Sequence, residues 1–281
     1  MSTTSRQTAL RFATEQLQHL DTPRLDAEIL LTHVLGISRA QLYAWPEKLL
    51  DDTQWQQFQS LIEQRVQHQP IAYLTGHKEF WSLNLQVNAA TLIPRPETEL
   101  LVEHALKYIE SIAQPIILDL GTGSGAIALA LAQECPQAQV IAVDVNPQAL
   151  EMAKHNAQAL QLNQVQFYLS HWFRDLPMLQ AHIIVSNPPY IADDDPHLTQ
   201  GDVQFEPRQA LTSGQDGLND IREIAAQAKD FLLPEGYLLF EHGYDQEVVV
   251  QQILLEQGYQ KVETIKDLAG QARVSLCQNK T

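Results

Sequence analysis

The first 76 residues carry apolar residues at the spacing of helices alone. Thr22 and Pro23 are residue types that favour a helix start, and Gly36 favours its end. A second helical run begins at Asp52 and places large apolar residues on one face: Trp55, Phe58, Leu61, Ile62 and Val66. We therefore expect a small all-helical domain over residues 1–76, with such residues in its core.

The pattern changes in residues 77–95. Leu83, Leu85 and Val87 alternate with polar residues, which is the period of a half-buried strand. We expect this segment to form a short strand or hairpin that links two domains. Residues 92–99 should then lead into a helix.

From residue 115 onward, short apolar segments alternate with helical ones. This alternation predicts a mostly parallel sheet with helices on both faces, in a domain over residues 96–281. The final two strands have no helix between them and should pair antiparallel. The expected strands are residues 115–120, 140–143, 165–169, 183–186, 237–241, 261–265 and 273–277, and the expected helices are 126–133, 147–160, 218–232 and 245–257.

Charge and residue counts exclude several classes of function. The chain has 18 Lys and Arg against 34 Asp and Glu, a formal net charge of −16, so we expect no direct nucleic-acid partner. The two cysteines are too few for a disulfide framework, and the ten histidines show no metal-ligand spacing, so no metal site is expected. The sequence has no apolar leader and no apolar stretch of about 18 residues. We therefore expect a cytoplasmic protein without a membrane partner.

The segment Asp119–Gly125 lies between the first strand of the predicted sheet and its helix. Its glycines permit a sharp turn and a close approach of a ligand to the backbone. Asp144 ends the next strand, where a carboxylate can accept hydrogen bonds from both hydroxyls of a ribose. This pattern alone fits a nicotinamide cofactor as well as S-adenosyl-L-methionine. Asp119 favours the second, because it can hold the amino group of a methionine moiety but would repel a pyrophosphate.

Asn187-Pro188-Pro189-Tyr190 follows the predicted strand 183–186 and should lie beside the cofactor crevice. The Asn187 side-chain oxygen and the Pro188 carbonyl can accept both N–H bonds of a planar NH2 group. The prolines restrict the backbone that carries these acceptors, and Tyr190 can pack on the flat face of the group. Hydride transfer needs no such pocket. The segment therefore indicates methyl transfer to an amide or amino nitrogen, with Asn187, Pro188 and Tyr190 as catalytic candidates.

With these motifs the sequence resembles the bacterial peptide chain release factor N(5)-glutamine methyltransferases over nearly its whole length. The glycine loop and the Asn-Pro-Pro-Tyr segment alone are typical of a larger group of amino-methylating enzymes. The helical N-terminal domain and the segment Ile93–Glu99 narrow the resemblance to this family. Other matching segments are Pro70–Gly76, Glu79–Trp81, Phe205–Pro207, Ala210–Leu211 and Glu241–Gly243, with Asp267, Gly270 and Arg273.

The resemblance implies a Rossmann-like class I methyltransferase fold that uses S-adenosyl-L-methionine and releases S-adenosyl-L-homocysteine. The methyl acceptor would be the side-chain amide nitrogen of the glutamine in the Gly-Gly-Gln motif of class-1 peptide chain release factors. A monomer is expected, with its domain over residues 1–76 docking the release factor. Donor contacts would be Gly121, Thr122, Gly123, Ser124, Gly125, Asp144, Trp172 and Asn187, and glutamine contacts Asn187, Pro188, Pro189 and Tyr190, with Arg95, Glu97 and Phe205 as further candidates.

Four alternatives stay open at this point. Arg95 and Glu97 also suit the start of a helix, and Phe205 also suits ordinary packing. A DNA or RNA adenine amino-methyltransferase would act on a similar NH2 group, although base flipping normally comes with a basic groove. A degenerate methyltransferase that serves as an interaction protein is the non-catalytic alternative, and the intact motifs argue against it.

Overall fold

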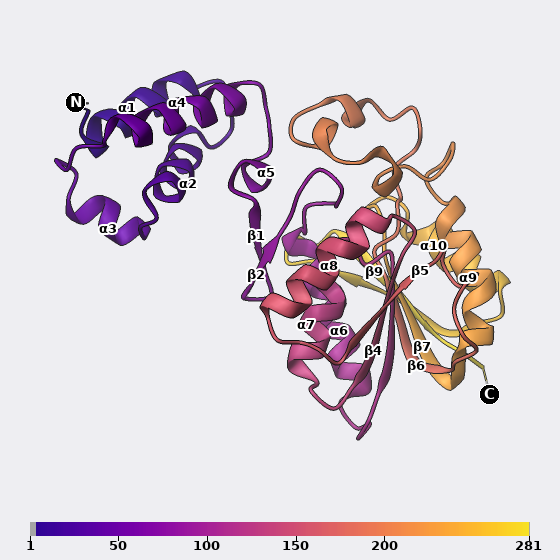
Figure 1. Ribbon diagram of the computed structural model, residues 1–281. Coiled ribbons are helices and arrows are strands. Elements are labelled where there is room, and N and C mark those ends of the chain that lie inside the picture. Colours follow the sequence, from indigo (N-terminus) through magenta and orange to yellow (C-terminus); the bar gives the residue numbers. More distant parts are fainter. Residues whose placement is uncertain (1–3, 281) are drawn as a thin grey trace. The chain divides into compact units, whose positions relative to one another are not determined.

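The computed structural model describes residues 4–280, which divide into two compact units (Figure 1). One unit comprises the described residues up to His77 together with Thr199–Phe205. The other comprises Lys78–Leu198 and the described residues from Glu206 onward. The second segment of the smaller unit lies inside a long connection of the larger one, and this interruption has no counterpart in the apolar pattern of the sequence.

The smaller unit is helical. Its helices are α1 (Arg6–Gln16), α2 (Pro23–Leu35), α3 (Arg39–Ala44), α4 (Asp52–Val66) and α5 (Ile71–Thr75), and they bury a core that includes Leu30, Leu31, Phe58 and Ile62. The predicted helices after Thr22 and after Asp51 are therefore confirmed, and Gly36 ends α2 in the left-handed conformation with φ 61°.

Some side-chain contacts in this unit were not predicted from the sequence. Thr22 occupies the N-cap position of α2, but its hydroxyl does not cap the helix and donates instead to Asp26 Oδ1 at 2.8 Å. Asp26 also binds Arg65, whose Nε lies 2.7 Å from Asp26 Oδ2 and whose Nη1 lies 2.7 Å from Asp202 Oδ1. The two ion pairs of Arg65 join the segment Thr199–Phe205 to the helices of the same unit.

Strands β1 (His77–Phe80) and β2 (Leu83–Gln86) form a two-stranded hairpin, as the alternating pattern predicted. Trp81 and Ser82 make the turn with φ of 51° and 60°, which is the pair of positive values that a tight two-residue hairpin requires. After the hairpin, the short 3₁₀ helix η1 (Pro96–Thr98) leads directly into α6 (Glu99–Ile109).

The larger unit is built on a sheet that, within residues 4–280, has seven strands in the order β5-β4-β3-β6-β7-β9-β8. Strands β3 to β7 are parallel, and β9 runs antiparallel between β7 and β8. The predicted mostly parallel, Rossmann-like sheet and its antiparallel end are confirmed. The strands are β3 (Ile116–Leu120), β4 (Gln139–Asp144), β5 (Val165–Leu169), β6 (Ala181–Ser186), β7 (Leu232–Glu241), β8 (Gln260–Lys266) and β9 (Ala272–Gln278).

Helices cover both faces of this sheet. Helix α6, α7 (Ala126–Glu134) and α8 (Pro147–Ala159) pack on one face, over side chains such as Ile117 and Val185. Helices α9 (Asn219–Phe231) and α10 (Glu247–Glu256) pack on the other face, over side chains such as Leu118 and Phe240 (Figure 1). None of the helices in the described chain is long and apolar enough to cross a membrane.

Strand order reverses beside β3, because β4 lies on one side of it and β6 on the other. In open sheets of this type, such a reversal leaves a crevice at the carboxyl ends of the strands. Leu120, the last residue of β3, pairs with Val143 of β4 and with Ser186 of β6, so the segments that follow these strands emerge together. Short 3₁₀ helices η2 (Pro196–Thr199), η3 (Val203–Phe205) and η4 (Arg208–Ala210) lie in the connection after β6.

Candidate active site

The glycine loop after β3 adopts a conformation that only glycines favour. Gly121, Gly123 and Gly125 have φ of 73°, 57° and 88°. A Cβ added at Gly125 would come within 2.9 Å of Leu129 Cδ1, so this position also needs the absence of a side chain. Helix α7 starts immediately after the loop, and its first N–H groups and partial positive charge lie at the crevice.

Asp144, at the end of β4, is hydrogen-bonded to this loop. Its Oδ2 accepts from the backbone N–H of Gly123 at 2.8 Å, and its Oδ1 accepts from the N–H of Asn146 at 2.8 Å. Burial raises the pKa of the Asp144 carboxyl. Each carboxylate oxygen has a second lone pair, so both can accept a further bond from a ligand hydroxyl.

Asp119 is the second-last residue of β3 and is completely buried. Its Oδ2 accepts from the Thr122 hydroxyl at 2.7 Å and from the Ala128 N–H at 3.2 Å, whereas Oδ1 has no partner among the described residues. Burial raises the pKa of this carboxyl to about 7. A buried acceptor without a partner costs stability, and a bound cationic group would relieve that cost.

Trp172 follows β5 and has a positive φ of 49°. Its indole Nε1 donates to Asp220 Oδ1 at 3.2 Å, and Ser213 Oγ lies 2.6 Å from Asp220 Oδ2. A Cβ added at Gly121 would lie 3.4 Å from the Trp172 ring, so the ring packs against the glycine loop. The indole therefore forms a flat wall that suits a heterocyclic base.

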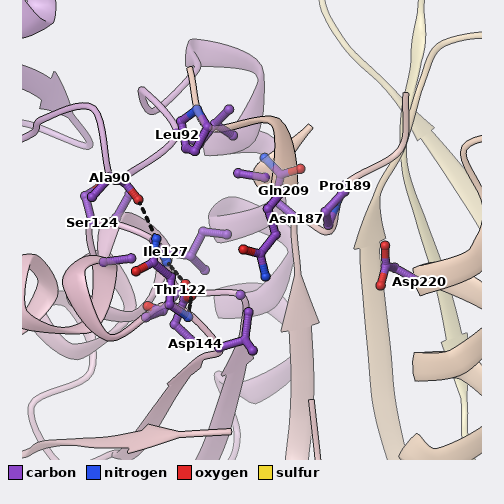
Figure 2. A pocket seen from close by; sticks show the side chains of 18 of the residues that line it. Ala90, Leu92, Thr122, Ser124, Ile127, Asp144, Asn187, Pro189, Gln209 and Asp220 are labelled. Atoms are coloured by element: carbon purple, nitrogen blue, oxygen red, sulfur yellow. Dashed lines mark hydrogen bonds between the residues drawn. The ribbon is translucent and has the colours of Figure 1, made fainter. Parts of the chain in front are cut away.

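Asn187 follows β6, next to the glycine loop. Ser186, the residue before it, donates its hydroxyl to Leu120 O at 2.8 Å, which ties the ends of β6 and β3 together. The Asn187 side chain donates from Nδ2 to Thr98 Oγ1 at 3.2 Å. Its Oδ1 is buried and accepts no hydrogen bond within residues 4–280. In Figure 2 this side chain projects into the space that the labelled residues enclose.

Tyr190 and Glu241 form the neighbouring corner. The Tyr190 hydroxyl donates to Glu241 Oε1 at 3.4 Å, and burial raises the pKa of the tyrosine. Glu241 ends β7 and is 1% exposed, and burial raises the pKa of its carboxyl to about 7. Glu241 Oε2 is buried and without a hydrogen-bond partner in the described chain.

A cavity of about 250 Å³ lies between the glycine loop, Asp144, Trp172 and Asn187. Of the residues predicted as donor or glutamine contacts, eight line it: Gly121, Thr122, Gly123, Ser124, Asp144, Trp172, Asn187 and Pro189. Figure 2 labels Thr122, Ser124, Asp144, Asn187 and Pro189 among them. Four further predicted residues do not line the cavity: Asp119 in β3, and Gly125, Pro188 and Tyr190 in the loops next to it.

The other three predicted contacts lie elsewhere. Arg95 forms an ion pair with Glu206, which also accepts from the N–H of Ile93 at 3.0 Å. Glu97 is exposed in η1, and Phe205 belongs to the helical unit. Their substrate roles stay predictions.

Several lining residues were missed by the sequence analysis. They are Ala90 and Leu92 after the hairpin, Thr98 in η1, Gln209 and Thr212 near η4, and Asp220 in α9. Thr98 belongs to the segment Ile93–Glu99 that carries the resemblance, so that segment was the available signal. Asp220 has no motif of its own, and only the fold brings it to Trp172.

Two family models match the chain. The model described as PrmC N-terminal domain matches residues 8–76, and the model described as Methyltransferase small domain matches residues 96–270. Among solved structures, a methyltransferase from Pyrococcus furiosus superposes with a TM-score of 0.52 at 17% identity, over 71% of this chain and 90% of that one. The METTL16 methyltransferase domain superposes with a TM-score of 0.54 at 18% identity, over 72% and 91%. At these identities the two structures show the fold alone.

Sequence relatives are much closer. The release factor glutamine methyltransferase of Vibrio cholerae serotype O1 is 50% identical over 276 residues, which are 97% of this chain and 96% of that protein. The protein of the same name from Escherichia coli K12 is 50% identical over 268 residues, 95% of this chain and 96% of that protein. The one from Shewanella oneidensis is 48% identical over 270 residues, 95% and 94%. With a methyltransferase model over most of its length and such relatives over nearly all of it, the chain belongs to the release factor glutamine methyltransferases.

Proposed function

We propose that this enzyme transfers a methyl group from S-adenosyl-L-methionine to the side-chain amide nitrogen of the glutamine in the Gly-Gly-Gln motif of class-1 release factors. The names of its relatives support the acceptor. The site supports the same reaction through its own chemistry. The observation that carries the proposal is the Asn187 side chain, whose oxygen faces the cavity and has no partner within residues 4–280.

The residues around the cavity fit the donor in three ways. Asp144 offers two carboxylate oxygens with free lone pairs, suited to a ribose diol. The Trp172 ring suits the face of an adenine, and the N-terminus of α7 suits a carboxylate. The unpartnered Asp119 Oδ1 lies beneath the same loop and would attract a cationic amino group. When bound, S-adenosyl-L-methionine supplies a methyl group on a cationic sulfur.

The residues after β6 fit a planar amide. We infer that Asn187 Oδ1 accepts one N–H bond of the glutamine and that the Pro188 carbonyl accepts the other. Pro189 lines the cavity beside them, while Tyr190 is held behind by its bond to Glu241. Two acceptors and a rigid backbone would leave the amide nitrogen with a single orientation in the cavity.

The chemical step needs orientation more than it needs a base. The amide nitrogen forms the new N–C bond as the S–C bond breaks, and the sulfur leaves as a neutral thioether. The nitrogen then carries one proton too many and is strongly acidic, so that proton passes to water without a strong general base. An amide lone pair is delocalised and a poor nucleophile. Holding it in reacting geometry can contribute roughly 7–11 kcal/mol.

We further propose a division of labour along the chain, with residues 1–76 docking the release factor, 77–95 linking, and 96–281 methylating. A Gly-Gly-Gln tripeptide offers little surface, and free glutamine is abundant, so discrimination needs a remote contact. The helical unit exposes large side chains that its core does not use. Trp45 is 45% exposed and Leu49 is 61% exposed, in the segment after α3.

Mass spectrometry of a purified release factor, after incubation with this enzyme and the donor, tests the proposed function. We expect a mass gain of one methyl group, located on the Gly-Gly-Gln glutamine. A release factor with Gly-Gly-Asn in that place is the matched control and should stay unmodified. Methylation of a DNA or RNA adenine under the same conditions, without any modification of release factor, would overturn the proposal.

A further inference from the structure

The amide of Asn187 could in principle face the cavity in either of two ways. With Oδ1 inward it accepts a hydrogen bond from a substrate N–H, and with Nδ2 inward it donates one. Only the first orientation suits an NH2 acceptor. Rotation of the amide by half a turn would present a donor to a donor and expel the glutamine nitrogen. Something in the fold must therefore select the orientation.

Thr98 is the residue that meets the outer side of this amide. It lies in η1 and is 4% exposed. Its hydroxyl oxygen accepts a hydrogen bond from Asn187 Nδ2 at 3.2 Å. A hydroxyl has only one hydrogen, so it can accept from Nδ2 and donate elsewhere, or donate to Oδ1. The direction of that single O–H bond decides which end of the amide turns to the cavity.

Glu241 is the group that can take the hydroxyl hydrogen. Burial raises the pKa of the Glu241 carboxyl, and the nearby Thr98 hydroxyl lowers it by a smaller amount. The two side chains form no hydrogen bond within the described residues, and the proximity leaves a free carboxylate oxygen within reach of the hydroxyl. Oε1 already accepts from Tyr190, while Oε2 is buried and has no hydrogen-bond partner in residues 4–280. Phe240, which precedes Glu241, pairs with Ser186, which precedes Asn187, so the two side chains start from matched positions on neighbouring strands.

We propose that Glu241 is a positioning residue of the methyl-transfer site, which acts through Thr98 to hold Asn187 Oδ1 toward the substrate amide. The carboxylate accepts the Thr98 hydroxyl hydrogen, the hydroxyl oxygen then accepts from Asn187 Nδ2, and Oδ1 is left facing the cavity. Glu241 and Thr98 touch no reacting atom in this arrangement. The inference rests on the proposed function, because Glu241, Thr98 and Asn187 would together make the site prefer an amide NH2 as the methyl acceptor.

Replacing Thr98 by valine tests the inference in the full-length enzyme. Valine keeps the shape of threonine but offers Nδ2 no acceptor, so the Asn187 amide is free to turn. We expect kcat on a Gly-Gly-Gln peptide to fall by about tenfold or more, since misplaced groups cost on that scale. Donor affinity by calorimetry should stay within about twofold, because Thr98 is not among the proposed donor contacts. Thr98→Ser keeps the hydroxyl and should restore most of kcat.

A second readout needs no turnover. A Gly-Gly-Glu peptide offers acceptors only, so it favours the turned amide, whereas Gly-Gly-Gln favours the native one. Peptide affinities measured without donor should show a clear preference of the wild type for glutamine, and Thr98→Val should shrink it. Should the valine variant fail to fold, Thr98→Ala carries the same expectation.

The outcomes separate the inference from the proposed function. A wild-type enzyme that cannot methylate any Gly-Gly-Gln substrate removes the proposed function. An active wild type with Thr98→Val unimpaired in kcat and in glutamine preference removes only the role of Glu241 and Thr98. A serine variant as impaired as the valine variant also removes it, because packing rather than the hydroxyl would then be the cause.

Discussion

The backbone N–H of Gly123 donates to Asp144 Oδ2 at 2.8 Å, so the carboxylate that ends β4 also holds the glycine loop that follows β3. Gly123 has a φ of 57°, in the left-handed region, and the bond holds it in that conformation. One side chain thus shapes the loop and presents oxygens to the same cavity.

Asp144→Ala should therefore weaken S-adenosyl-L-methionine binding by about 1.5–3 kcal/mol, the range for hydrogen bonds to a charged group. Calorimetry with the purified variant measures this loss. Asp144→Asn keeps one acceptor oxygen and should lose less, while Asp175→Ala, an exposed aspartate outside the cavity, should lose nothing. Equal affinity of Asp144→Ala and wild type would show that Asp144 does not hold the ribose.

Asn187→Ala should lower kcat by ~10²-fold or more while the fold and most of the donor affinity persist, because only the acceptor for the substrate amide is lost. Steady-state methylation of a Gly-Gly-Gln peptide measures kcat, and calorimetry measures donor affinity. Asn163→Ala, at an exposed asparagine, is the control. Near-normal turnover by Asn187→Ala would rule out the assigned role.

The pH dependence of kcat should report Glu241. Its pKa is raised to about 7, so the carboxyl becomes protonated as the pH falls below about 7. A protonated Glu241 can donate to Thr98, which frees the threonine hydroxyl to donate to Asn187 and turns the amide the wrong way. With saturating donor and peptide, kcat should therefore fall on the acid side, with an apparent pKa near 7.

Other titratable and charged groups lie near the Glu241 carboxylate, and they determine which control variants the pH experiment needs. Tyr190 and Arg273 both have raised pKa values and keep their protons through neutral pH, and Glu97 raises the pKa of Glu241. Glu241→Gln should abolish the acid limb of the profile, whereas Glu97→Gln should only move it toward lower pH. An unchanged acid limb in Glu241→Gln would assign the titration to another group.

Burial of Asp119 should make the free energy of unfolding depend on pH when no donor is bound. Its pKa of about 7 lies above the value of an unfolded aspartate, so the folded state binds the proton more tightly. Its contribution is therefore fully present below about pH 4 and is lost as the pH rises to about 7. Asp119→Asn should raise the free energy of unfolding at pH 8, by at most about 4 kcal/mol, and should change it little at acid pH. Urea unfolding at both pH values measures the difference, and equal effects at both would contradict it.

The proposed docking role predicts a split between substrates. Trp45→Ser combined with Leu49→Ser should raise KM for intact release factor and leave kcat/KM for a short Gly-Gly-Gln peptide unchanged. The control is Leu255→Ser, since Leu255 is 59% exposed on α10 of the other unit. Equal kinetics of the double variant and the wild type with intact release factor would exclude this surface from docking.

The sheet was predictable from the sequence because its signals are local. Apolar runs of strand length, glycines in the loop and the acid at Asp144 each reveal their own structure within a few residues, and the structure has these elements where they were expected. The pairing of Arg95 with Glu206 was not predictable, because the two residues are 111 positions apart. Nothing in the sequence around either residue indicates the other as its partner. The sequence around Arg95 and Glu97 suggested only a helix start.

The contact between Thr98 and Asn187 was hidden for the same reason. Thr98 looked like part of a helix start, and its place behind the amide depends on how η1 meets the end of β6. Glu241 belongs to one of the segments that carry the resemblance, but the sequence alone indicated no chemical role for it. Its burial and its unpartnered oxygen, within the part of the chain that the structure describes, are properties of the assembled sheet.

The interrupted make-up of the helical unit has a consequence for chimeras. Arg65 binds both Asp26 and Asp202, and Asp202 arrives in the second segment of that unit. An exchange of helical units between relatives that transfers only residues up to His77 would separate Arg65 from its native Asp202. The side chain of Arg65 is only 10% exposed, so a mismatched residue at position 202 would leave part of a guanidinium without its counter-charge. A recombinant enzyme that is to inherit another relative's partner preference intact must therefore be spliced at three junctions, after residue 77 and on each side of residues 199–205, rather than at one.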